Sequence, residues 1–208
     1  MLIEICCKMK NPHILSIILL LLAAPLSGQE ERFGPCCQPL SWSNIQIDTD
    51  ELPENARKML LVTNRPYTPE SEEGELFPNG LAEYRQVSYM LASCVDGNWQ
   101  LQHVDDFFSG LGAIDDGRDL LVFVHGHGKA MPPVLTRSHQ ILQKYGVSLV
   151  VFDWPSFHSN FNKSLSRVRR CGENFYNLLL QLQEYRQSTM QADQHLSLLM
   201  HSLGNYFL

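Results

Sequence analysis

Short apolar runs alternate with longer amphipathic stretches over the second half of the chain. The runs at 119–124, 147–152 and 195–200 have the length and apolar character of buried parallel strands. Between them, residues 131–145 and 164–187 carry apolar side chains at helical spacing, which predicts two amphipathic helices. This alternation predicts an α/β fold, a mostly parallel sheet with helices on both faces.

The first half of the chain predicts an antiparallel start to the same sheet. Residues 58–64, 85–92 and 98–104 are expected to be strands. Asp96-Gly97, between the last two, is a strong hairpin signal. Prolines, glycines and glutamates between the first two strands indicate a surface loop.

A serine follows the last predicted strand, in the sequence Met200-His201-Ser202-Leu203-Gly204. In α/β-hydrolases, a serine at such a strand-to-helix turn is the nucleophile, and the positions two before and two after it are usually small. Gly204 fits this pattern and Met200 does not. Because Ser-x-Gly at a strand end also occurs in ordinary turns, the motif alone leaves both interpretations open.

The loop after the first parallel strand reads His125-Gly126-His127-Gly128. Glycines let the backbone approach a substrate closely and turn N–H groups toward it. In α/β-hydrolases this loop supplies one donor of the oxyanion hole, and the residue after the serine supplies the other. The N–H of Leu203 is therefore one expected donor, and this loop is expected to supply the other. A metal site is the alternative for the two histidines, but no nearby Cys or Glu completes a ligand set.

Several motifs resemble those of an uncharacterised bacterial α/β-hydrolase family, which is recognised by VHG, a WPS strand end and HSMGN. The matching segments are Val124-His125-Gly126, Trp154-Pro155-Ser156 and His201-Ser202-Leu203-Gly204-Asn205, together with Thr63-Asn64-Arg65 for an N-terminal TNR signature. The resemblance covers residues 58–208. It implies a lipase- or esterase-like fold of unassigned substrate, with Ser202 as nucleophile and His127 and Leu203 at the oxyanion hole.

The acid and the histidine of that family have no counterpart, because the chain ends six residues after Ser202. The chain is therefore expected to be a C-terminally truncated fragment, inactive as it stands and with an incomplete sheet. Asp153 and His125 lie at the same strand ends and are the candidate substitutes, although a structural role is expected for both. His201 is expected to point away from the serine, into packing.

Two functions remain open. The first is an exported serine hydrolase that acts on a small-molecule or lipid acyl ester through Ser202. The second is a non-catalytic exported binding protein that keeps the hydrolase scaffold. Met200 and the missing triad partners favour this second function. Nothing in the sequence indicates a cofactor.

The N-terminus predicts a targeting signal. An apolar run over 14–25, preceded by two lysines, is typical of a secretory signal peptide at 1–28 and is too short for a membrane span. The polar stretch 29–57 is expected to be a loosely ordered arm before a partial α/β-hydrolase domain at 58–208. The protein is therefore expected to be exported, periplasmic or secreted, without a stable membrane span after cleavage.

Composition and charge narrow the expected partners. A formal charge of −6 argues against nucleic acid or an anionic membrane as the main partner. With 208 residues and 44% apolar content, the chain can bury one sizeable core. After export, Cys36, Cys37, Cys94 and Cys171 would meet an oxidising compartment, and the sequence does not choose among their pairings.

Overall fold

The structure is a computed structural model of the protein. It describes residues 41–47, 52–54, 56–69, 75–82, 86–156 and 160–208, and the backbone pairing of 16–17. The rest of the predicted signal peptide and much of the predicted arm, including Cys36 and Cys37, lie outside the described residues.

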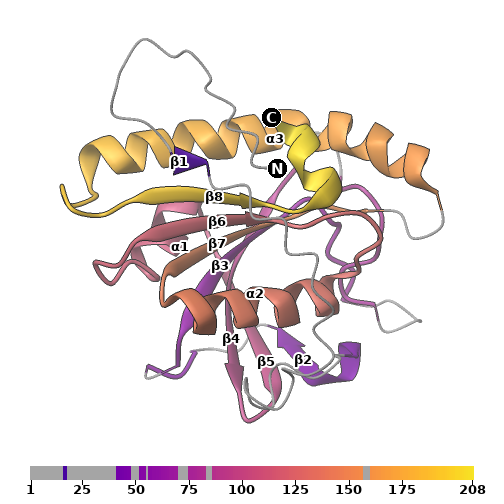
Figure 1. The fold of residues 1–208 in the computed structure, drawn as a ribbon. Coiled ribbons are helices and arrows are strands. Elements are labelled where there is room, and N and C mark those ends of the chain that lie inside the picture. Colours follow the sequence, from indigo (N-terminus) through magenta and orange to yellow (C-terminus); the bar gives the residue numbers. More distant parts are fainter. Residues whose placement is uncertain are drawn as a thin grey trace.

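The strands of the described residues form one sheet in the order β1-β8-β6-β7-β3-β4-β5-β2 (Figure 1). They are β1 (Ser16–Ile17), β2 (Ile45–Ile47), β3 (Lys58–Thr63), β4 (Ser88–Val95), β5 (Asn98–Val104), β6 (Leu120–Val124), β7 (Ser148–Asp153) and β8 (Leu196–Met200). β1, β8, β6, β7 and β3 run parallel to one another. β4 is antiparallel to β3 and β5, and β2 pairs parallel with β5. The mostly parallel sheet with an antiparallel start is therefore confirmed.

The predicted hairpin and the first long helix form where the sequence places them. Asp96 and Gly97 have φ angles of 50° and 84°, the left-handed pair that a tight hairpin turn requires. α2 (Met131–Tyr145) has a proline in its first turn and ends at Gly146, whose φ is 65°.

The second long helix, α3 (Phe161–Ser188), begins earlier than the periodicity predicts, because the Asn160 side chain accepts a hydrogen bond from the Lys163 N–H and caps it. A short helix, α1 (Phe107–Gly112), was not predicted. Two 3-10 helices complete the described elements, η3 (Trp42–Asn44) and η4 (Ser202–Phe207).

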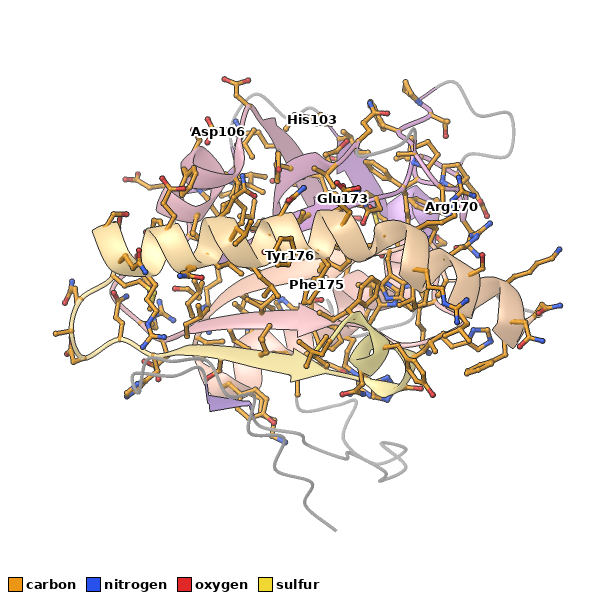
Figure 2. All side chains as sticks on the ribbon, turned by 90° about the horizontal axis from the view of Figure 1, so that it is seen from above. His103, Asp106, Arg170, Glu173, Phe175 and Tyr176 are labelled. Carbon is orange, nitrogen blue, oxygen red and sulfur yellow. The ribbon has the colours of Figure 1, made fainter. Side chains whose placement is uncertain are left out.

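The helices α2 and α3 cover opposite faces of the sheet (Figure 1). Because strand side chains alternate between faces, Val122 and Val150 join the core under α3, and Phe123 and Val151 join the core under α2. Figure 2 looks down on α3, where neighbouring residues have opposite environments: Phe175 is fully buried and Tyr176 is 60% exposed. This two-faced core is the α/β-hydrolase-like architecture that the sequence predicts.

The strand order reverses around β6, which lies between β7 and β8. The chain passes from β6 to β7 through α2 on one face, and from β7 to β8 through α3 on the other. Open α/β sheets bind ligands beyond the carboxyl ends of the strands at such a reversal. The loop after β6 and the turn after β8 meet there, and the His201 N–H donates to the Val124 carbonyl at 3.0 Å.

Candidate active site at the Ser202 turn

Ser202 occupies a sharp turn between β8 and η4. Its φ is +52°, a left-handed conformation that costs a residue other than glycine on the order of 1 kcal/mol. The Gly204 N–H donates to the His201 carbonyl at 2.9 Å, and the Asn205 side chain donates to the Ser202 carbonyl at 2.7 Å. These bonds hold the turn while the Ser202 side chain remains exposed.

Two glycines bring this turn against the loop after β6. A β-carbon built on Gly126 would lie 2.9 Å from the Ser202 β-carbon and 2.8 Å from the His201 Nδ1. A β-carbon on Gly204 would lie 2.8 Å from the His125 carbonyl oxygen. Because all three distances are too short for a β-carbon, this close approach requires glycine at both positions.

Met200 supplies none of the three atoms closest to a β-carbon built on Gly204. The atoms that crowd Gly204 belong to Val124 and His125, whereas Met200 is 4% exposed and joins the core on the α3 face. The tight packing is therefore between the Ser202 turn and the end of β6 with its following loop. This explains why a large residue fits two positions before Ser202.

The expected oxyanion donors lie on the two segments that meet here. Neither the His127 N–H nor the Leu203 N–H donates a hydrogen bond to another described residue. For Leu203 this follows from its place in the first turn of η4, where helical N–H groups lack an intrahelical acceptor. Both N–H groups are therefore without an acceptor among the described residues.

A buried ion pair lies at the same strand ends. The Arg65 guanidinium donates to both oxygens of Asp153, from Nε at 2.7 Å and from Nη2 at 3.1 Å, and both side chains are fully buried. The Thr63 hydroxyl donates to Asp153 Oδ2 at 2.7 Å, and His125 Nε2 lies 3.1 Å from Oδ1. Burial alone raises the pKa of the Asp153 carboxyl, but Arg65 and His125 outweigh it and hold that pKa well below its usual range.

The same network fixes the loop after β6. Arg65 Nη2 donates to the Lys129 carbonyl at 2.8 Å, and the Lys129 N–H donates to the Ser156 hydroxyl at 2.7 Å. His127 Nδ1 lies 2.8 Å from the hydroxyl of Ser164 on α3. The TNR and WPS motifs thus supply the residues that hold the loop beside Ser202.

The structure assigns Asp153 and His125 to this network. His125 Nδ1 lies 2.9 Å from the Gly126 carbonyl, its Nε2 lies 3.1 Å from the Trp154 backbone nitrogen, and its ring stacks on the Trp154 ring. Neither Asp153 nor His125 is hydrogen-bonded to Ser202. Their observed contacts lie within this network.

His201 lies outside the packed interior, so the expectation that it points into packing is wrong. Its side chain is exposed, with Nδ1 beside Gly126. Partial burial of the ring, followed by the charges of Arg137, Lys129 and His125, lowers its pKa. Over the described residues, no histidine is hydrogen-bonded to the Ser202 hydroxyl.

The structure also bears on the other candidate chemistry. Within the described segments, no three His, Cys, Asp or Glu side chains gather as a metal site would require.

Cys94 is disulfide-bonded, and Cys171 is a free, buried thiol whose pKa burial raises to about 12. A cavity of about 390 Å³ lies between α3 and the β3–β4 pair, lined by residues such as Tyr89 and Asn177, and Ser202 is not part of its lining.

No helix in the part of the chain that the structure describes has the length and apolar character needed to cross a membrane.

Comparison with known proteins supports the hydrolase scaffold. Searches of curated proteins and of solved structures found no match to the chain. Residues 110–208 match the profile of a family described as "alpha/beta hydrolase of unknown function (DUF900)". The matched segment contains β6, β7, β8 and both long helices, and hence the Ser202 turn and the loop that faces it.

Proposed function

We propose that this protein is a serine hydrolase of the esterase or lipase type, with Ser202 as its nucleophile. The observation that carries the proposal is the Ser202 turn: a left-handed serine after the parallel strand β8, closely packed against a glycine of the neighbouring loop. The matched family profile supports the same assignment for the scaffold.

The reaction would be acyl transfer through the serine. The Ser202 Oγ attacks the ester carbonyl carbon, and the carbonyl oxygen gains negative charge as its double bond opens. The N–H groups of His127 and Leu203 would stabilise that oxygen, and losing one such donor typically lowers kcat about 100- to 1,000-fold. The ester C–O bond then breaks, the alcohol leaves with the proton given up by the Ser202 hydroxyl, and water hydrolyses the acyl-serine to release the acid and restore that hydroxyl.

The reaction also needs a base that accepts the proton of the Ser202 hydroxyl, and none of the described residues is hydrogen-bonded to that hydroxyl. Ser202 makes no side-chain hydrogen bond to any of them, and both nitrogens of His125 have other partners. We therefore propose that this chain alone turns over esters very slowly. The same observation favours a second candidate function, a non-catalytic binding protein that uses the hydrolase scaffold.

Ester hydrolysis by matched variants separates the two functions. Rates with 4-nitrophenyl acetate and butyrate are compared for the wild type, Ser202→Ala and Ser188→Ala, which removes an exposed serine at the end of α3. The hydrolase proposal expects a wild-type rate above background that only Ser202→Ala abolishes. Equal rates in all three proteins would instead support the binding protein.

We also propose that the protein is exported, through the signal peptide expected at 1–28. Cleavage after Gly28 would remove β1, whose Ser16 and Ile17 pair with Ser197 and Leu198 at the edge of β8. N-terminal sequencing of the protein recovered from a bacterial periplasm or culture medium tests this. A mature protein that begins at Gln29 supports export, and recovery of the uncleaved chain in the cytoplasm alone contradicts it.

A further inference from the structure

The cavity of about 390 Å³ beside α3 is built by three segments of the chain. They are β3 with Val62, the start of β4 with Tyr89, and the side of α3 that faces these strands. Val62 and Tyr89 are paired across the two strands, so both side chains lie on the sheet face that α3 covers. Ser202 and the loop after β6 do not line this cavity, so it is separate from the proposed ester site.

The packing of α3 explains why this space stays open. The buried stripe of the helix, which includes Phe175 and Leu182, packs on the sheet. The neighbouring row, at i, i+3 and i+7, consists of Asn174, Asn177 and Gln181, and it faces the cavity. These polar side chains stand where larger apolar residues would close the gap between α3 and β4.

The lining of the cavity is uncharged. No Asp, Glu, Lys or Arg is among the described residues that line it. Charged residues make up 18% of the chain and occur elsewhere on the surface of α3, for example Arg170 and Glu184. A charged ligand would lose hydration here without meeting an opposite charge, which is unfavourable. The cavity therefore favours a neutral ligand.

The α3 wall of the cavity offers free hydrogen-bonding groups. The Gln181 side chain is hydrogen-bonded to the Tyr89 phenol. Asn174 is half-buried, Asn177 is exposed, and neither side chain is hydrogen-bonded to any described residue. Each of these two amides has two N–H donors and a carbonyl acceptor to offer. Groups that both donate and accept, such as hydroxyls, match this wall.

The other side chains at the cavity are apolar. Val62 and Leu178 are each 2% exposed and form its floor, whereas Leu180 is 47% exposed and lies at its mouth. Tyr89 is the one aromatic residue among the described residues of the lining, so a flat base could not be held between two rings. A sugar ring combines the required surfaces, because its hydroxyls lie around the edge and its faces expose C–H groups.

From this arrangement we infer that the cavity binds a neutral saccharide, with its hydroxyls on Asn174 and Asn177 and a C–H face against the apolar side chains. The volume lies toward the lower end of the range for ligand sites, about 300–1,000 Å³, which suits a small saccharide. This binding goes beyond the proposed ester hydrolysis and does not depend on Ser202.

Binding is tested by NMR of the full chain with labelled Val and Leu methyl groups. The probes are the methyl glycosides of glucose, galactose and N-acetylglucosamine, with adenosine as a neutral flat competitor. At least one sugar is expected to shift the methyl signals of Val62, Leu178 and Leu180 at millimolar concentration, and not those of Leu203 beside Ser202. No shift with any sugar, shifts centred on Leu203, or tighter binding of adenosine would each overturn the inference.

Matched variants then assign the binding to the two free amides. Asn174→Leu and Asn177→Leu keep the size of the side chain and remove its amide, so each should weaken sugar binding about 3- to 10-fold. Asn162→Leu makes the same change at an exposed position of α3 outside the cavity and should leave the affinity unchanged. Equal affinity in all three variants would overturn the inference.

Two controls complete the test. The methyl spectrum of each variant shows whether it is folded, and the exposed position of Asn177 keeps the test valid if Asn174→Leu is unstable. Affinity for the neutral sugar should be the same at low salt and in about 0.5 M NaCl, whereas a strong salt dependence would contradict an uncharged site. Ser202→Ala should bind the sugar as the wild type does, so failure of the hydrolase proposal leaves this result unaffected.

Discussion

Arg65 and Asp153 form a fully buried two-point ion pair at the carboxyl ends of β3 and β7, with Nε–Oδ2 at 2.7 Å and Nη2–Oδ1 at 3.1 Å. The pair joins segments that lie 88 residues apart in the chain. Because Arg65 also holds the Lys129 carbonyl, the ion pair determines where the loop after β6 lies relative to Ser202.

Breaking this pair should destabilise the protein strongly. Arg65→Met or Asp153→Asn removes one partner and leaves the other buried without compensation, which costs about 3–5 kcal/mol for buried pairs. Urea unfolding of each variant measures the loss. Arg118→Gln is the matched control, since its ion pair with Asp116 is exposed and should contribute under about 1 kcal/mol. Similar losses in both pairs would contradict the assigned role.

The close approach at the Ser202 turn should tolerate no side chain at Gly126. Gly126→Ala places a methyl group 2.9 Å from the Ser202 β-carbon, so either the loop or the turn must move. Such overpacking costs about 1–3 kcal/mol and should abolish any Ser202-dependent ester hydrolysis. Gly172→Ala on α3, where nothing lies within 4 Å, should be neutral or slightly stabilising. Thermal melting compares the two, and equal stability of both variants would refute the crowding.

Acid should destabilise the fold through Asp153. The folded-state pKa of this carboxyl is depressed below its ordinary value of 3.8, so its ionised form stabilises the folded protein above that pH. This contribution is lost as the pH falls through the folded pKa, because protonation then breaks the pair with Arg65. Urea midpoints between about pH 5 and pH 2 should fall more steeply for the wild type than for Asp153→Asn. Parallel pH profiles would rule out this linkage.

The buried thiol of Cys171 should be unreactive in the folded protein. Burial raises its pKa to about 12, so almost no thiolate is present at pH 8. Iodoacetamide at pH 8 is expected to alkylate Cys171 only after denaturation, as followed by peptide mass mapping. Rapid alkylation of the folded protein would show that Cys171 does not lie buried between α3 and the sheet.

The sequence predicts most of the sheet and the place of Ser202, because both depend on local patterns. The apolar runs give β6, β7 and β8, and the Pro and Gly signals give the bounds of α2. α1 was missed because its six residues, two of them glycine, carry no periodic pattern; Asp106, which caps it, was the available signal. Likewise, Ile45–Ile47 of the expected loose arm forms β2, whose partner β5 lies more than 50 residues later.

The supporting network could not be predicted from local patterns. Arg65 appears in the sequence only as part of a motif, and its pairing with Asp153 depends on the sheet order that brings β3 beside β7. The hydrolase pattern predicts a small residue at the position of Met200, two before the serine. In the structure, the closest contacts at the turn are instead made at Gly126 and Gly204. In each case the missing information is which distant segments touch.

The central claim is that Ser202 is a nucleophile held beside an oxyanion hole. The most direct measurement is intact-protein mass spectrometry after incubation with 4-nitrophenyl butyrate, followed by peptide mapping of any adduct. We expect one butyryl group per chain, located on Ser202 and absent from Ser202→Ala. Labelling that is spread over lysines, or that persists unchanged in Ser202→Ala, would contradict the claim.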